Sequence, residues 1–523
     1  MKRMIALFAL VTPLFAANAL TTNVWTNGSG DFLFNTPGNW QSGNPPTNGE
    51  FLSFPSGTCA TNDIAGLEVS GLLIGTSSTF TLEGEGLSLL AEARIVKASG
   101  DLTFKNGLEF QAGDHVFEVN GALTLDGAMS GPGSFEVVCE MTKTLNITPN
   151  NDSFTGDIWA TNSCLTLNGY YNYYITGKDN NVHIRRMSIN KNGARLHSNV
   201  FIYESTGSQN TPGIYDYCGD TGIYGDLTFY GGTRVRRSNT GNPFFVDGKL
   251  HLAANFMPQP GSTGVKFAFN DIVSGKGFYT TGSNVSGTYT FNAAGNTFEY
   301  FELHEGGGNV VFAKPDSMPH GMYFLFGVNT GSLTVSGDQT CLDIRSEAWN
   351  ASRTFYVTST VPSKITMMGN WDRNFAGALL GDLSLVWSPT SNKRYGLTSQ
   401  SSVNTMTGSL EVEAGTMVLT AGQSYPDLSE IVVSGTAKMT IPSGVSINPN
   451  LKKITIGPNA RLELAEGVAL TPDLFYVGGE KMWAKETYTG IDGAADAKQI
   501  EQIVGAGTVT PRKGRSGLCV RLK

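Results

Sequence analysis

Charge is scarce in this chain, and so are long apolar runs. Only 15% of the residues are charged, and the formal net charge is −8. An acidic chain is poorly suited to nucleic acid as its main partner. After residue 19, no stretch reaches the roughly 18 to 20 apolar residues that a membrane-spanning helix needs. We therefore expect no nucleic-acid partner and no spanning helix in the mature chain.

Cysteine is also rare, with six residues in a chain of 523. The sequence contains no Cys-x-x-Cys pair and no Cys/His cluster with metal-ligand spacing, so we expect neither a disulfide scaffold nor a zinc site. Cys139 and Cys164 lie about one repeat length apart, which would suit neighbouring coils of a repetitive fold. This pair could form a disulfide or remain as two buried thiols, and the thiols are favoured.

Catalytic motifs are missing as well. The chain has no HExxH, no GxSxG, no Walker loop and no EF-hand loop, and its six histidines are scattered. We therefore name no catalytic residue, no metal ligand and no cofactor. A pair of carboxylates on adjacent coils stays open, because neighbouring strands lie about 4.8 Å apart and distant acidic residues can meet.

The first 19 residues, "MKRMIALFALVTPLFAANA", have the features of a signal peptide. Lys2 and Arg3 precede an apolar run, and Ala17-Asn18-Ala19 fits the small-x-small cleavage pattern. The alternative is a buried first strand or helix. The signal peptide is favoured, and it predicts export to the cell surface, the medium or the periplasm.

Glycine is abundant, at 64 of 523 residues, and rows of helix-forming residues at 3.6 spacing are nearly absent. Asn, Thr and Ser are also frequent, which is typical of short strands joined by tight turns. An apolar content of 40% is too high for a disordered glycine-rich linker. The composition therefore favours an all-β protein.

An internal repeat indicates how the strands are arranged. The pattern Gly-x-Leu-polar-apolar occurs seven times, and in each copy the Leu and the last residue should share one face. Three of the gaps between copies are 21, 23 and 27 residues, about twice the spacing of a hairpin meander. This spacing fits one coil of a β-solenoid, whose apolar faces are buried only when coils stack. The copies begin at Gly100, Gly121, Gly225, Gly248, Gly331, Gly381 and Gly408.

A longer unit appears twice, as "DSFTGDIWATNSCLTL" at 152–167 and "NTMTGSLEVEAGTMVLT" at 404–420. We expect each to form a corner at Thr-Gly, a strand, a second turn and another strand. Leu410, Val412, Met417 and Leu419 should face inward in the later copy. A weaker third copy starts at Asn296 and keeps the Asn but not the Thr-Gly pair.

These two segments resemble the autotransporter-associated β-strand repeat, also called the passenger-associated transport repeat. The openings Trp25 and Asn39-Trp40, and the tail "LFYVGGEKMWAKETYTG" at 474–490, are similar to exported bacterial proteins that carry this repeat. The resemblance implies an exported, right-handed parallel β-helix that is often adhesive or structural. The chain ends "GRSGLCVRLK" without the membrane β-barrel of classical autotransporters, so another export or anchoring route is expected.

One region is locally basic. Residues 178–237 hold eight Lys or Arg and five Asp or Glu. Five of the arginines are in the strands "HIRRMSI" and "TRVRRS", and four tyrosines precede these strands. Arginine pairs with carboxylates and tyrosine stacks on sugar rings, which suits an acidic polysaccharide. A solvated outer face is the simpler interpretation. The candidate binding residues are Arg185, Arg186, Arg234, Arg236, Tyr171 and Tyr173, with Arg237 beside them.

The sequence thus predicts an all-β protein, a right-handed parallel β-helix with caps at both ends. Its expected parts are the signal peptide (1–19), an N-terminal cap (20–60), the solenoid (61–465) and a C-terminal cap (466–523). The favoured function is a non-enzymatic structural or adhesive surface protein, whose partner is a polysaccharide or another surface protein. Two alternatives remain, a carbohydrate-active lyase or hydrolase and a pure glycan-binding module.

Overall fold

The computed structural model describes most of the chain between residues 21 and 514. It excludes 140–142, 149–152, 168–180, 190–194, 204–212, 217, 219–220, 239, 281–285, 305–307, 328–329, 347–354, 399–402 and 494. The expected signal peptide at 1–19 and the candidate residues Tyr171 and Tyr173 lie outside the described residues. The chain divides into two compact units, residues 1–203 and 204–523, which we treat separately.

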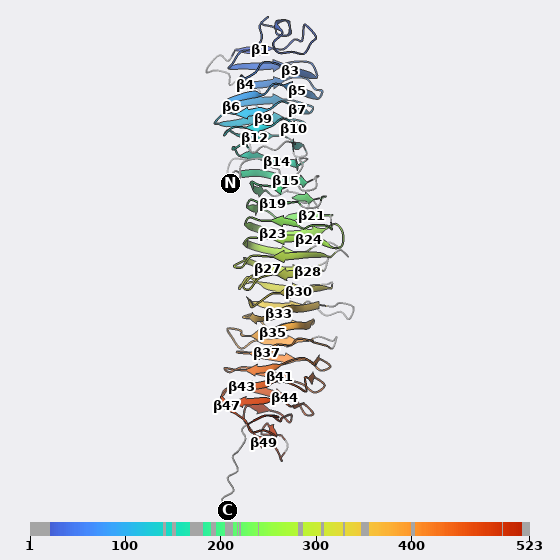
Figure 1. The fold of residues 1–523 in the computed structure, drawn as a ribbon, viewed down its shortest axis with the longest axis vertical. Coiled ribbons are helices and arrows are strands. Elements are labelled where there is room, and N and C mark those ends of the chain that lie inside the picture. Colours follow the sequence, from blue (N-terminus) through green and yellow to red (C-terminus); the bar gives the residue numbers. More distant parts are fainter. Residues whose placement is uncertain are drawn as a thin grey trace, which may run out of the picture. The chain divides into compact units, whose positions relative to one another are not determined.

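In the first unit, successive coils pair in parallel (Figure 1), and the register pairs align their strands in three ladders, which we call sheets below. The first sheet contains β1 (Thr22–Val24), β2 (Glu50–Phe54), β4 (Leu67–Ile74), β6 (Leu87–Lys97), β9 (Asp114–Val119), β12 (Ser134–Val138), β14 (Ile158–Leu167), β15 (Asn181–Ile189) and β17 (Asn199–Ile202), which β16 (Arg195–Leu196) precedes. The second contains β3 (Cys59–Asn62), β5 (Phe80–Gly84), β7 (Leu102–Phe104), β10 (Leu123–Leu125), β13 (Thr144–Ile147) and the second halves of β14 and β15. The third contains the first halves of β4 and β6, then β8 (Leu108–Phe110) and β11 (Met129–Ser130).

The second unit repeats this plan. Its first sheet contains β18 (Ile214–Asp216), β21 (Thr233–Arg237), the ends of β23 (Leu250–Pro260) and β25 (Val273–Tyr279), β27 (Thr297–Leu303), β29 (Tyr323–Phe326) and β32 (Asp343–Ser346). Further along the chain come β34 (Arg373–Phe375), β36 (Arg394–Leu397), β38 (Thr416–Leu419), β41 (Lys438–Ile441), β44 (Arg461–Leu464) and β50 (Ile503–Val504).

The other two sheets of this unit alternate with the first around each coil. One contains β19 (Gly222–Ile223), β22 (Phe244–Val246), β24 (Val265–Phe269), β26 (Gly287–Phe291), β28 (Gly308–Phe312), β30 (Gly331–Val335) and the starts of β33 (Phe355–Met367) and β35 (Ala378–Trp387), with the short pairs β39 (Ser424–Tyr425)–β42 (Ser446–Ile447) and β45 (Ala469–Leu470)–β51 (Thr508–Val509) further along. The other contains β20 (Leu227–Phe229), the starts of β23 and β25, β31 (Gln339–Cys341), the ends of β33 and β35, β37 (Ser409–Val412), β40 (Glu430–Val433), β43 (Lys453–Ile456) and β46 (Leu474–Val477).

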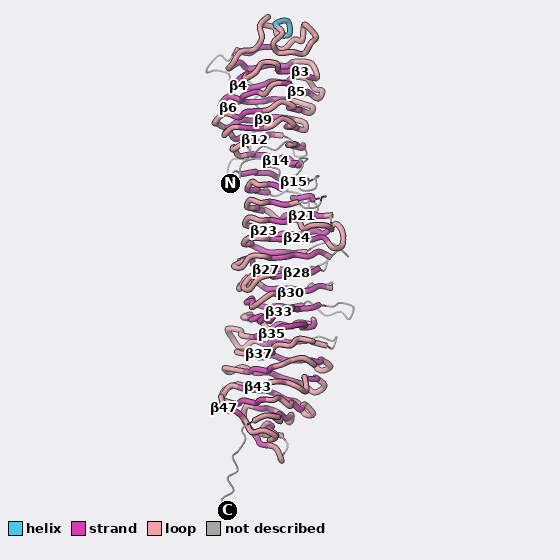
Figure 2. The backbone as a smooth tube through the Cα atoms, viewed as in Figure 1, coloured by secondary structure: helices cyan, strands magenta, loops and turns pink. Residues whose placement is uncertain are grey.

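The predicted all-β, parallel β-helix is confirmed. Strands and turns alternate around every coil, and the described residues contain a single short helix, the 3-10 turn η1 (Pro37–Asn39), drawn in cyan in Figure 2. Register partners on adjacent coils are mostly 20 to 25 residues apart, as the pairs Tyr323–Asp343, Val310–Leu333 and Leu385–Leu410 illustrate. A coil of this length accommodates three short strands and three corners.

Both ends of the chain depart from parallel pairing. Trp25 and Trp40 form an antiparallel bridge, and both rings are almost fully buried against Phe54 of β2, with centroids 5.9 and 6.1 Å away. At the other end, β46 pairs antiparallel with β47 (Glu480–Lys481), and β48 (Tyr488–Thr489), which pairs with β49 (Lys498–Gln499), lies antiparallel to β51. Antiparallel segments interrupt the parallel ladder that a further coil would need. The boundaries at 60 and 465 remain predictions.

The repeated motif fills the core as predicted. Both apolar residues of all seven copies are at most 1% exposed. Neighbouring copies lie on one another, because Leu102 pairs with Leu123 and Leu227 with Leu250. In the last pair the register is shifted by two, so that Leu385 pairs with Leu410. Inward ladders of this kind are the solenoid core.

The two longer copies form the same corner. Thr155 donates from its backbone N and its Oγ1 to Gly131 O, at 2.9 and 3.4 Å, and Thr407 does the same to Gly381 O at the same distances. The next residue must be glycine in both copies. A Cβ at Gly156 or Gly408 would lie 2.0 or 2.3 Å from a carbonyl oxygen of the preceding coil. The Thr-Gly pair is therefore repeated because it solves one steric problem twice.

The inward positions also agree with the prediction. Leu410, Val412, Met417 and Leu419 are at most 1% exposed. In the earlier copy Phe154, Ile158 and Ala160 are fully buried, while the side chains of 161–167 are not described.

We expect Leu410→Asp to lower the thermal midpoint of the second unit strongly. The change removes a fully buried ladder residue and buries a carboxylate without a partner. The loss should be at least the roughly 2–5 kcal/mol that truncation of a buried leucine costs. Val418→Asp, at a half-buried outward position of β38, is the matched control and should change the midpoint little. Equal melting of both variants would contradict the inward assignment.

Candidate functional site

The predicted basic strands are β15 and β21, which belong to different units. On β15, Arg185 is 9% exposed and Arg186 is half-buried. On β21, Arg234 is half-buried and Arg236 is exposed. The predicted partners Tyr171 and Tyr173 lie outside the described residues, so the polysaccharide patch stays a prediction.

Arg237 does not share the outward orientation of its neighbour Arg236. Its guanidinium is fully buried and forms an ion pair with the equally buried Asp216, which lies 21 residues earlier. Thr221 Oγ1 donates to Asp216 Oδ2 at 2.8 Å, and Arg237 also donates to the carbonyl of Asn242. Burial raises the pKa of Asp216 and lowers that of Arg237, while the attraction between the two charges opposes both shifts. The pair is therefore part of the interior.

The aromatic column beside Arg185 has its ring faces covered. Trp159, His183 and Phe201 are register partners on three coils of the first unit. The His183 ring lies 3.5 Å from Trp159 and 4.6 Å from Phe201, nearly parallel to both. Burial lowers the pKa of His183, with the charge of Asp157 opposing. Because each ring covers the next, the inner faces of this column are closed to a sugar.

The cysteine pair is not aligned across coils. Cys164 pairs in register with Thr144 rather than with Cys139. Cys139 is half-buried, and the side chain of Cys164 is not described.

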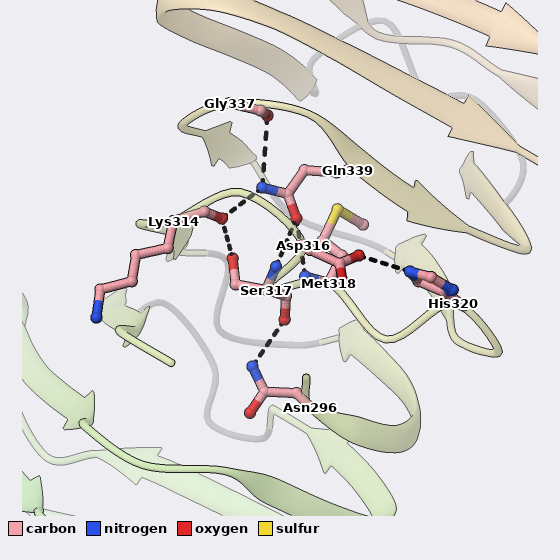
Figure 3. Close-up of polar contacts among 8 residues, drawn as sticks. All are labelled: Asn296, Lys314, Asp316, Ser317, Met318, His320, Gly337 and Gln339. Carbon is pink, nitrogen blue, oxygen red and sulfur yellow. Dashed lines mark hydrogen bonds and ion pairs between the residues drawn. The ribbon is translucent and has the colours of Figure 1, made fainter. Parts of the chain in front are cut away.

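Polar side chains inside the second unit connect neighbouring coils (Figure 3). Asn296 accepts a hydrogen bond from Val273 N at 2.8 Å and donates to Ser317 O at 2.7 Å. Gln339 Oε1 accepts from the backbone N of Ser317 and Met318, at 3.0 and 2.8 Å. Asn404 repeats the arrangement by accepting from Leu379 N and donating to Ser424 O. These amides satisfy corner backbone groups that no ladder reaches, so their role is structural.

The strongest cluster of chemical groups lies where three strands of the second unit begin. Tyr323, Asp343 and Arg373 are the first residues of β29, β32 and β34, and Tyr323 and Asp343 are register partners. With Glu302, Arg345 and Trp371 they form what we call the Asp343 cluster.

Two arginines flank the central carboxylate. Arg373 Nε lies 3.2 Å from Asp343 Oδ2, and Arg345 Nε lies 3.8 Å from Oδ1. Asp343 is 3% exposed, and its Oδ1 has no hydrogen-bond partner among the described residues. Burial raises the pKa of Asp343, while Arg345 and Arg373 oppose the shift. The three groups together carry one excess positive charge when all are ionised.

Aromatic rings border the same groups. The Arg345 guanidinium carbon lies 4.1 Å from the centroid of the Tyr323 ring, which stacks at 5.5 Å on Tyr300 of the preceding coil. Tyr323 Oη donates to Glu302 Oε1 at 2.7 Å. Burial raises the pKa of Tyr300 to about 12, and burial together with Glu302 raises the pKa of Tyr323. Both phenols therefore stay protonated at neutral pH.

Trp371 completes the cluster at the surface. Its ring centroid is 6.0 Å from the Arg373 guanidinium carbon. At 66% exposed, it is the most exposed large hydrophobic residue of the described chain. An exposed indole beside an arginine is an unusual combination for a surface that only needs to be soluble.

Sequence reasoning missed this cluster because its spacing is irregular. Arg373 and Asp343 are 30 residues apart, longer than the usual coil. A signal was present in "GNWDRN" at 369–374, where a tryptophan stands in a polar turn. A search for Trp in turns, rather than for charge excess, would have found it.

In the described ranges, no three His, Cys, Asp or Glu side chains gather to hold a metal ion. Nor does any helix there have the length and apolar character needed to cross a bilayer.

No protein-family model, curated protein or solved structure matches this chain. The likeness of 152–167 and 404–420 to the autotransporter-associated repeat therefore stays a prediction.

We expect Arg237→Met alone to destabilise the second unit by roughly 3–5 kcal/mol, because it leaves Asp216 buried without its partner charge. The double variant Asp216→Asn/Arg237→Met should recover much of that loss, since it removes both charges and keeps an acceptor for Thr221. Urea unfolding of the two single variants and the double variant gives the coupling energy. Strictly additive losses would show that the ion pair is not the relevant contact.

Proposed function

We propose that this chain is an exported β-solenoid with a structural or adhesive role at the cell surface and without catalytic activity. The observation that carries the proposal is the regular display of outward side chains. Lys266, Thr288, Asn309, Ser332 and Tyr356 occupy one outward position on five successive coils of the second unit. Such a column presents side chains about 4.8 Å apart. Repeated weak contacts along it would add up through multivalency.

Hydrogen bonds between side chains hold the outer surface in place. Ser332 Oγ donates to Asn309 Oδ1 at 2.7 Å. Asn292 Nδ2 donates at 2.7 Å to Asn270 Oδ1 of the preceding coil, and both asparagines directly follow register partners of β24 and β26. A surface with fixed side chains loses less conformational entropy on binding. The signal-peptide pattern of residues 1–19 and the repeat resemblance support export and a surface location.

A carbohydrate-active enzyme is the second candidate. The Asp343 cluster favours it, because a buried carboxyl group with a raised pKa lies between two arginines, one of which, Arg373, is next to exposed Trp371. A buried carboxyl group at a surface site is a candidate general acid or base for such an enzyme. The two candidates differ in whether a bound polysaccharide is cut.

We expect beads coated with the mature chain, residues 20–523, to be retained on one or more immobilised polysaccharides or proteins. The same polysaccharides, incubated with the soluble protein, should show no new reducing or unsaturated chain ends. Beads coated with heat-unfolded protein are the control and should lose retention, because adhesion needs the aligned columns. New chain ends would replace the proposal with the enzyme. Absence of retention on every surface would reject adhesion and leave a purely structural role.

A further inference from the structure

We infer that the Asp343 cluster binds an acidic saccharide, with a sugar carboxylate on Arg345 and Arg373 and a sugar ring on Trp371. This deepens the adhesive role proposed above, on which it rests, by naming a site and a class of ligand. The site differs from the basic strands β15 and β21 that the sequence singled out.

Arg345 is positioned but its hydrogen-bonding capacity is unused. The Tyr323 ring lies against one face of its guanidinium at 4.1 Å, and its nearest carboxylate contact is the 3.8 Å approach to Asp343. It donates no hydrogen bond to the described residues, although a guanidinium carries five N–H donors. Its side chain is 23% exposed, so a ligand can reach it. A planar carboxylate matches the fork of these donors.

Arg373, on the other side of Asp343, also has a nitrogen that makes no hydrogen bond to the described residues. Its Nε donates to Asp343 Oδ2 at 3.2 Å and its Nη1 to the carbonyl of Asp372 at 3.3 Å. No described residue accepts from Nη2. Asp343 thus fixes both arginines while neutralising only one of them. The positive charge that remains on these three groups suits a carboxylate of the ligand, while Glu302, the acceptor of Tyr323 Oη, brings the whole cluster to neutrality.

The aromatic and acceptor groups favour a saccharide over a simple anion. Trp371 offers an exposed indole face next to Arg373, suited to the apolar face of a pyranose ring. Glu302, which already accepts from Tyr323, supplies a carboxylate acceptor for sugar hydroxyl groups on the same strand face. A nucleic acid would also offer rings and negative charge, but the net charge of −8 opposes a polyanion of that density.

The test is calorimetric titration of the mature full-length chain with a galacturonate oligosaccharide, and with the same oligosaccharide after methyl esterification. We expect saturable binding of the acid and little binding of the ester. Arg345→Gln should weaken binding roughly tenfold or more, since it removes charge-assisted hydrogen bonds. Trp371→Ala should weaken it severalfold and, at an exposed position, leave the melting temperature unchanged.

Two matched variants serve as controls. Arg236→Gln removes an exposed arginine of β21, and Trp483→Ala removes another tryptophan, 40% exposed, near the C-terminal end. Both should bind the acid as the parent chain does. Equal affinity for acid and ester, equal losses in the controls, or no saturable binding would each overturn the inference.

The outcome is separable from that of the proposed function. Bead retention on other surfaces without galacturonate binding would reject this ligand and leave the adhesive role in place. Release of unsaturated or reducing ends from the bound oligosaccharide would support the site and reject the non-enzymatic role.

Discussion

Coil-to-coil pairing in parallel register is the constraint on which the rest of this structure depends. A single coil has apolar residues on three inner faces and too little chain to cover them, so each coil is stable only between two neighbours. The backbone ladder fixes the separation of neighbouring coils, and the inward residues then have to form ladders. Leu410 illustrates the effect, since it pairs with Leu385 on one side and Ile431 on the other.

The same constraint explains the polar interior. Corners interrupt the ladder, and the backbone groups left there need partners. Asn296, Gln339 and Asn404 supply them from side chains, and Lys97 donates to three corner carbonyls in the first unit. Where the same kind of corner occurs twice, as at Thr155 and Thr407, the chain uses the same Thr-Gly pair. The sequence therefore repeats where the same backbone groups of a corner need hydrogen-bond partners.

The sequence predicted the features that lie within one coil and missed those that depend on contacts between coils. Alternation and spacing predicted the fold and the inward positions of all seven Gly-x-Leu copies, because both are properties of one coil. The orientation of Arg237 could not be predicted, since the buried Asp216 that pairs with it lies one coil away. The Asp343 cluster was missed for a similar reason, as Arg373 and Asp343 meet across a longer coil of 30 residues. Predicting a contact between coils requires the exact number of residues in each coil, and this number varies along the chain.

The most direct test of the account is cross-linking between register partners. Thr288→Cys/Asn309→Cys places two outward cysteines on partner positions of adjacent coils, and Thr288→Cys/Val311→Cys shifts the second by two residues. Partner Cα atoms in parallel strands are within the roughly 4.4–6.8 Å that a disulfide spans, whereas the shifted pair is further apart. The account predicts, by mass spectrometry after mild oxidation, a disulfide in the first variant and none in the second. Equal cross-linking of both, or a link in the shifted pair alone, would contradict parallel coils in this register.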